Sequence, residues 1–124
     1  MSLLRLPRQS GAAAEEKAKC YLERRGLKTL ERNFHCRRGE IDLVMQEADT
    51  LVFVEVRFRR DNRFGSAQES VTRSKQQRII AAARLFLGSR QQWIDAPCRF
   101  DVLAISGQHQ ENIDWVRDAF RPVS

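Results

Sequence analysis

Apolar and polar residues follow two different periods along this chain, and the changes of period divide it into helices and strands. Ala14, Ala18 and Leu22 recur at the spacing of one helical face. Ser10 is a suitable N-cap ahead of them and Gly26 supplies a stop, so the first helix is expected to start at Ser10.

Three strands are expected next. Residues 28–34 alternate loosely between apolar and polar, whereas residues 39–47 and 50–58 are either alternating or fully apolar. Only Ala48 and Asp49 separate the last two runs, which is a spacing typical of a β-hairpin.

A basic segment over residues 59–69 leads to a second helix, which Ser70 or Thr72 can cap and which ends at Gly88. Its expected buried stripe consists of four apolar residues at helical spacing: Ile79, Ala82, Ala83 and Phe86.

Two further strands, over residues 99–105 and 112–116, complete the order α-β-β-β-α-β-β. This order predicts an α/β fold in which helices flank a mixed central β-sheet. No repeat or linker interrupts residues 10–120, so they are expected to form a single domain. Residues 1–9 are predicted to be a mobile N-terminal tail and residues 121–124 a C-terminal tail.

The composition is that of a globular protein. Of the 124 residues, 42% are apolar and 31% are charged, which differs from the low hydrophobicity of disordered chains. The three cysteines follow neither a disulfide nor a zinc-binding spacing, which favours a reducing compartment. No stretch approaches the ~20 apolar residues of a membrane span, and no secretion signal is recognisable. We therefore expect a cytoplasmic protein with no membrane association.

The charge balance points to an anionic partner. The chain has 22 lysines and arginines against 16 acidic residues, a net charge of +6. Arginine forks match phosphate oxygens, so nucleic acid is a reasonable partner. Charge alone leaves open a basic protein that binds none.

The hairpin brings two carboxylates together. If its turn is centred between residues 48 and 49, Asp42 lies opposite Glu55 and Glu40 lies opposite Arg57, all on one face of the sheet. The other face is expected to be wholly apolar: Ile41, Leu43, Met45, Val52, Val54 and Val56.

Asp42 and Glu55 must be compensated, because two directly opposed carboxylates repel by roughly 3 kcal/mol at an effective dielectric constant of about 20. A shared proton, an Arg57 contact to Glu40 or Glu55, or a divalent cation could each do so. A site built only from oxygen ligands suits Mg²⁺ or Mn²⁺.

Two sequence runs carry a family resemblance: GEIDLV at residues 39–44 and VFVEVR at residues 52–57. They resemble the Asp and Glu-x-Lys core of restriction-endonuclease-like nucleases. More closely, residues 11–120 resemble the YraN family of uncharacterised bacterial proteins. Further matching segments are RNF at 32–34, FG at 64–65, Lys75, RFD at 99–101 and DAF at 118–120.

The resemblance implies a restriction-endonuclease-like fold akin to that of Holliday-junction resolvases, in which Asp42 and Glu55 would hold Mg²⁺ or Mn²⁺. Glu15, Glu16 or Glu40 could supply a further acidic group. In that chemistry the metal activates a water for attack on a phosphodiester. Resolvase-like relatives are also compatible with a homodimer, although no residue pattern indicates an interface.

Arg57 stands where this nuclease pattern has a lysine, and Ile41 where the broader pattern has a proline. Arginine stays protonated, so Arg57 can clamp a phosphate or stabilise the transition state but cannot act as a general base. Lys75 continues the stripe of the second helix and could act in place of the missing lysine; the alternative is a solvated lysine at a helix start.

Five arginines near these segments could follow a nucleic-acid backbone, or could be ordinary solvated charges. They are Arg59, Arg60, Arg63, Arg73 and Arg78. Arg99 and Asp101 share a strand face and are interpreted as a structural ion pair, with a place at the border of the site as the alternative.

Three functions compete. The first is a metal-dependent endonuclease that hydrolyses phosphodiester bonds in DNA, including branched or damaged DNA. The second is a catalytically silent nucleic-acid-binding module of the same fold, which Arg57 favours. The third is a protein-interaction domain in which the acidic pair is structural.

Overall fold

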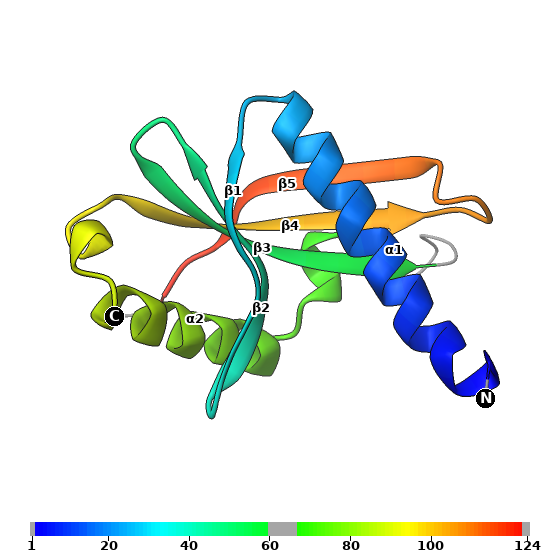
Figure 1. The fold of residues 1–124 in the computed structure, drawn as a ribbon, viewed down its shortest axis with the longest axis horizontal. Helices are drawn as coiled ribbons and strands as arrows, with labels where there is room; N and C mark the ends of the chain where they lie inside the picture. The colour runs from blue at the N-terminus through cyan, green and yellow to red at the C-terminus, as the bar shows by residue number, and fades with distance from the viewer. Residues whose placement is uncertain (1, 60–66, 123–124) are drawn as a thin grey trace.

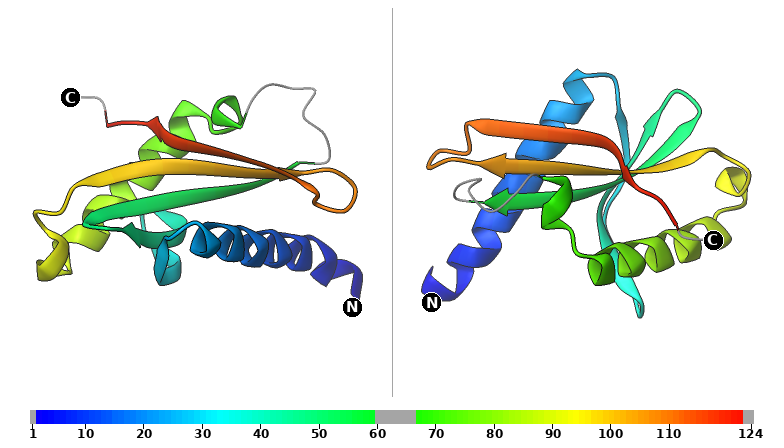
Figure 2. Two further views of the ribbon diagram at one scale, coloured as in Figure 1. Left: turned by 90° about the horizontal axis from the view of Figure 1, so that it is seen from above. Right: turned by 180° about the vertical axis from the view of Figure 1, so that it is seen from behind.

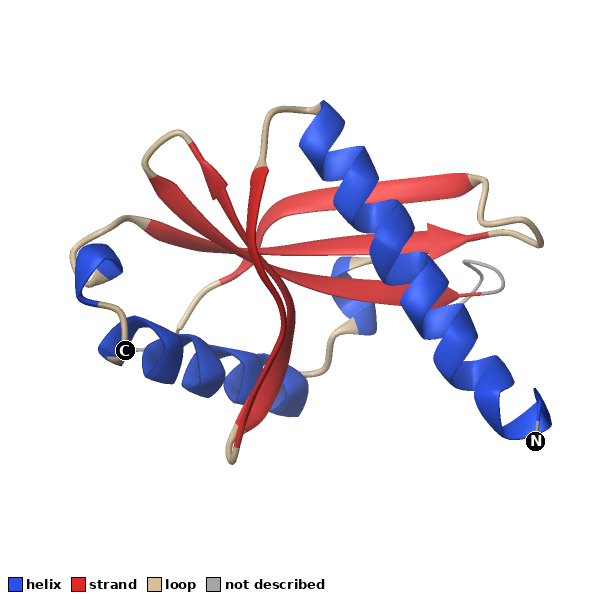
Figure 3. Ribbon diagram, viewed as in Figure 1, coloured by secondary structure: helices blue, strands red, loops and turns tan. Residues whose placement is uncertain are grey.

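The computed structural model describes residues 2–59 and 67–122, with side chains from residue 11 onward in the first range. Two single-turn 3₁₀ helices, Gln68–Ser70 and Gln91–Trp93, join the longer elements. Those elements, drawn in Figure 1 and coloured by type in Figure 3, are α1 (Ser2–Arg24), β1 (Lys28–Cys36), β2 (Gly39–Glu47), β3 (Thr50–Arg59), α2 (Arg73–Gly88), β4 (Cys98–Ser106) and β5 (Asn112–Phe120).

The five strands form one mixed sheet in the order β1-β2-β3-β4-β5. Only β3 and β4 are parallel, and α2 lies in the crossover between them. The predicted fold class and order of elements are confirmed. Neither α1 nor α2 combines the length and apolar character that a membrane crossing requires.

The two helices cover opposite faces of the sheet. In Figure 1 α1 crosses in front of the strands, and in the reversed view of Figure 2 it passes behind them. The α1 face buries Ala18 and Leu22 against Val52 and Val54, and the α2 face buries residues that include Phe53. Strand β3 is covered on both sides, which is why residues 51–54 are all apolar.

The sequence pattern predicted the wrong start for α1 and the wrong end for β5. Helix α1 begins at Ser2, not at Ser10: a serine can cap a helix but need not interrupt one, and the leucines and arginines before it favour helix although Pro7 does not. Strand β5 continues past Val116 to Phe120, although Asp118 has a positive φ of 53°. The alternation breaks at this bulge, so the pattern predicted too short a strand.

Thr72, not Ser70, caps α2. Its hydroxyl accepts a hydrogen bond from the backbone N–H of Lys75 at 3.2 Å, whereas the Ser70 hydroxyl donates to the carbonyl of Ala67. The predicted stripe of α2 is buried throughout and its end at Gly88 is confirmed.

Strand β2 bends away from β3 halfway along its length. The ladder between them holds the predicted register from Glu47 opposite Thr50 to Leu43 opposite Val54. Before Leu43, β2 pairs with β1 alone in the described ladders, with Ile41 opposite Phe34. The tip of the β1-β2 hairpin therefore curves toward α2 (Figure 1).

The bend overturns two predictions. Ile41 packs in the α2-side core, not with Leu43 in the α1-side core. Glu40 does not face Arg57: it lies opposite His35, whose Nδ1 is 3.1 Å from the Glu40 carboxylate. Strict alternation fails here because a change of strand direction also changes the face to which each side chain points.

Gly39 fixes the curved hairpin against α2. A Cβ atom at this position would lie 2.6 Å from the backbone carbonyl oxygen of Arg78, so only glycine permits the approach.

Replacing Gly39 by alanine should lower the free energy of unfolding by about 1–3 kcal/mol, because backbone must shift to admit the methyl group. Urea denaturation followed by circular dichroism measures this change. Gly11→Ala is the matched control: no heavy atom lies within 4 Å of its added Cβ, and the helix should become equally or more stable. Equal effects of the two substitutions would contradict the close approach.

Candidate functional site

Because β2 bends away from β3, the side chain of Asp42 takes the place that the backbone of β2 would otherwise occupy beside β3. Beyond Val54, the backbone N–H of Val56 donates to Asp42 Oδ2 at 2.8 Å. The Asp42 carboxylate thus supplies an acceptor at the point where the backbone ladder with β2 has ended, and a buried amide requires such a partner. Asp42 is fixed in place by the architecture of the sheet itself.

Glu55 lies beside Asp42, one position before Val56. Glu55 is 4% exposed, and the two carboxyl groups share a hydrogen bond. Burial, and then the negative charge of Asp42, raise the pKa of Glu55 to about 8. Burial also raises the pKa of Asp42, against the opposing effect of the Val56 N–H. Both shifts favour the retention of a proton by the metal-free pair.

Two cationic side chains face the pair from different elements. The positive charge of Lys75, in the first turn of α2, lowers the pKa of both carboxyl groups. Arg57 Nη1 is 3.5 Å from Glu55 Oε2, so the predicted Arg57–Glu55 contact is present. Lys75 is half-buried and its charge acts on both carboxyl groups, which disfavours its interpretation as an ordinary solvated lysine.

Helix α1 contributes Glu15 to the same region. Glu15 is half-buried, and burial followed by the charge of Asp42 raises its pKa, while a hydrogen bond from the Asn33 side chain acts in the opposite direction. Glu16 instead lies 3.2 Å from Arg32. The charge of Glu40 reaches Asp42 and Glu15, although its ion-pair partner is His35.

Sequence reasoning missed Asn33. This residue has a positive φ of 54° at the bend and its side chain holds Glu15. Asparagine tolerates the left-handed region better than most residues, so an asparagine inside a strand pattern was the available signal.

The predicted arginines do not all gather at the pair. Arg59 is half-buried at the end of β3, and Arg60 and Arg63 lie outside the described residues. Arg73 lines a cavity between α2 and the C-terminal segment, and Arg78 lies beside Gly39.

Asp101 belongs to a separate structural network. It is fully buried and accepts hydrogen bonds from Arg99 Nε at 3.0 Å, Trp115 Nε1 at 2.9 Å and the backbone N–H of Asp118 at 2.9 Å. These contacts join β4 to the bulge of β5, and the structural interpretation of the Arg99–Asp101 pair is confirmed.

Asp42 and Glu55 fit Mg²⁺ or Mn²⁺ better than a metal that needs a full set of protein ligands. The donors are two carboxyl groups, and among the side chains of residues 11–59 and 67–122 no group of three or more His, Cys, Asp or Glu residues is placed to hold a metal. Mg²⁺ commonly binds through one or two carboxylates and keeps its waters. A cation would take the place of the shared proton and relieve the same repulsion.

Comparison with known proteins gives a consistent family match. Residues 14–105 match the model of a family described as "Uncharacterised protein family UPF0102". A UPF0102 protein of Nitrosococcus oceani is 50% identical over 115 residues, which cover 92% of this chain and 93% of the relative. One from Stutzerimonas stutzeri is 52% identical over 112 residues, covering 90% and 93%. One from Pseudomonas aeruginosa is 49% identical over 116 residues, covering 91% and 93%.

The Glu55 proton predicts a pH-dependent stability. Between the ordinary carboxyl pKa of 4.5 and about 8, the folded protein retains a proton that the unfolded chain has released. Glu55 therefore contributes most stability below pH 4.5, and this contribution is lost as the pH rises through about 8. Relative to Glu55→Gln, which lacks this titration, the wild type should lose on the order of a few kcal/mol of unfolding free energy across that window.

Urea denaturation at several pH values between 4 and 9, without divalent metal, measures the difference between the two proteins. Glu16→Gln serves as the control, because its side chain is exposed on α1. Parallel pH curves for wild type and Glu55→Gln would show that Glu55 does not hold the proton.

Proposed function

From the premise that the chain belongs to the uncharacterised protein family UPF0102, we propose that it is a Mg²⁺- or Mn²⁺-dependent endonuclease that hydrolyses phosphodiester bonds in DNA, including branched or damaged DNA. The YraN resemblance drawn from the sequence corresponds to this family. The cytoplasmic location expected from the sequence accompanies this proposal, and the three cysteines are free.

One observation carries the proposal: buried Glu55 lies beside half-buried Asp42, with an arginine in contact and the charge of a lysine acting on both. The pKa of each carboxyl group is raised, Arg57 contacts Glu55, and the charge of Lys75 reaches the pair from α2. Carboxylate oxygens can bind a metal cation. Positively charged hydrogen-bond donors beside them can bind the oxygens of a phosphodiester at that metal.

Each side chain has a distinct role in this proposal. A metal held by Asp42 and Glu55 would activate a water and neutralise charge on the phosphate. The Val56 N–H orients Asp42, and the burial of Glu55 limits its access to bulk water. Lys75 and Arg57 would donate hydrogen bonds to the phosphate oxygens on which negative charge develops.

A silent nucleic-acid-binding module is the second candidate, and Arg57 favours it. The strand that carries Glu55 offers no general base, because the position two residues later is an arginine. Such a module would bind DNA or RNA with a steep salt dependence and would cleave neither.

The metal site is tested by titrating Mn²⁺ into wild type and Asp42→Asn by calorimetry. The amide oxygen of asparagine can still accept the Val56 N–H, so the fold should persist in circular dichroism while metal binding falls at least tenfold. Wild-type affinity should rise from pH 6 to pH 8.5, because Mn²⁺ must displace the proton on Glu55. Glu16→Gln should bind like wild type; equal binding by Asp42→Asn would exclude the site.

Cleavage is tested with Mn²⁺ on branched, nicked and single-stranded DNA. Lys75→Gln should slow cleavage by about 10²-fold, as loss of one transition-state donor does elsewhere, yet should bind Mn²⁺ at least as tightly because a repelling charge is removed. Lys28→Gln, exposed at the start of β1, is the charge-matched control. Binding of DNA without cleavage by wild type would favour the silent module.

A further inference from the structure

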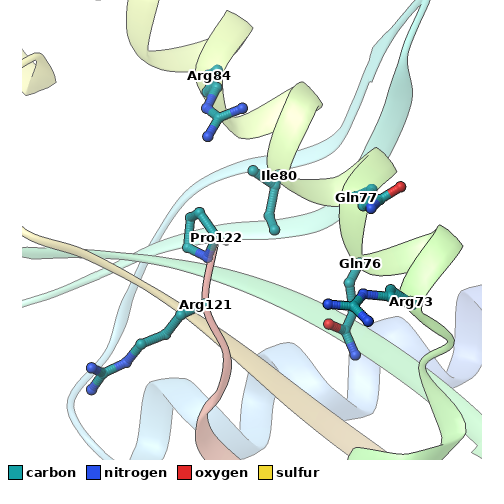
Figure 4. Close-up of a pocket in the computed structure, with 7 residues that line it drawn as sticks. All are labelled: Arg73, Gln76, Gln77, Ile80, Arg84, Arg121 and Pro122. Carbon is teal, nitrogen blue, oxygen red and sulfur yellow. The ribbon is translucent and has the colours of Figure 1, made fainter. Parts of the chain in front are cut away.

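Helix α2 presents a second functional surface on the side away from the carboxylate pair. Arg73, Gln77, Ile80 and Arg84 recur at helical spacing and line a cavity of about 270 Å³, which Gln76 and the C-terminal residues 121–122 complete. Figure 4 shows the side chains of α2 in a row, with Pro122 facing Ile80.

This cavity is positively charged. Three of its lining side chains are arginines and none is acidic. Arg121 is held by Asp118, with Nη2 2.5 Å from a carboxylate oxygen. Over residues 11–59 and 67–122, by contrast, no ion pair engages Arg73 or Arg84, whose side chains are exposed. Two uncompensated guanidinium groups thus lie at the two ends of one hollow, with amide donors between them (Figure 4).

We propose that this cavity binds the phosphodiester backbone of the nucleic acid on which the carboxylate pair acts, which deepens the proposed function and rests on it. Guanidinium groups bind phosphate oxygens in a bidentate manner, and the amide of Gln77 can donate as well, whereas the Gln76 amide donates to the Val71 carbonyl. The apolar side chains of Ile80 and Pro122 suit the sugar between two phosphates.

The start of α2 connects the two surfaces. Arg73 and Lys75 are two residues apart in its first turn, so they point to nearly opposite sides of the helix. The charge of Lys75 acts on the carboxylates, and Arg73 lines the cavity. A strand that passes over the start of α2 would meet both, with one phosphate at the pair and flanking phosphates in the cavity. Because these contacts involve phosphates and not base edges, binding here is independent of sequence.

The test compares two double variants with the same change of charge. Arg73→Gln with Arg84→Gln removes the free cations of the cavity. Arg24→Gln with Lys28→Gln removes two exposed cations that do not line it, at the last residue of α1 and the first residue of β1. Binding of a labelled DNA oligonucleotide is followed by fluorescence anisotropy in EDTA at several salt concentrations. The cavity variant should reduce the slope of log K against log salt by about 1.5, the value for two lost phosphate contacts, and the control should not.

Equal slopes for the two double variants would overturn the proposal. So would tight binding of inorganic pyrophosphate at the cavity without measurable DNA binding, because the ligand would then be a small free anion. This readout does not depend on catalysis. If the salt dependence of DNA binding depends on Arg73 and Arg84 but the protein cleaves no DNA, the cavity proposal is supported and the nuclease proposal is contradicted. Metal-dependent cleavage with an unchanged slope and rate in the cavity variant would support the nuclease and overturn the cavity as its nucleic-acid-binding site.

Discussion

The hydrogen bond from the Val56 N–H to Asp42 is the interaction on which the site depends. Strand β2 leaves β3 after the Leu43–Val54 pair, and the next amide of β3 needs an acceptor. Asp42 supplies one, and this brings its carboxylate against Glu55 in a region that both helices shield from water. The bend of β2 away from β3 therefore both ends the backbone ladder and brings Asp42 beside Glu55. In a regular hairpin of the same register, Asp42 would not accept this hydrogen bond.

A shared proton and a divalent cation are competing solutions to one electrostatic problem. Two adjacent carboxylates cannot both ionise in a poorly solvated environment unless a positive charge compensates them. Lys75 and Arg57 supply part of that charge, yet the pKa of Glu55 remains raised to about 8. Lys75 and Arg57 thus do not fully compensate the negative charge of the two carboxylates. This uncompensated charge distinguishes the Asp42–Glu55 pair from Asp101. Asp101 is equally buried, but Arg99 and two N–H donors satisfy it, so it has no comparable use for a metal.

The sequence was sufficient wherever a local pattern determined the structure. The hairpin register followed from a short turn between two apolar runs, and the buried stripe of α2 followed from helical spacing. It failed where a tertiary contact redirected the chain: the approach of Gly39 to Arg78 draws the β1-β2 hairpin toward α2, which turns Ile41 to the other core. The alternation of apolar and polar residues along a strand cannot predict that contact. The separation of Arg73 from the carboxylate pair was missed for the same reason, since a list of basic residues carries no information about which side of a helix each one occupies.

The parallel pairing of β3 with β4 explains why α2 serves both surfaces. A helix in a crossover between parallel strands runs back antiparallel to them, so its first turn returns to the carboxyl end of the strand it follows. In this chain that strand is β3, whose second half carries Glu55 and Arg57, and the returning turn carries Lys75. The outer side of the same turn carries Arg73, and the end of β5 reaches α2 through Pro122 to close the cavity. One topological feature thus places a cation near the carboxylates and another at the cavity, with the thickness of a single helix between them.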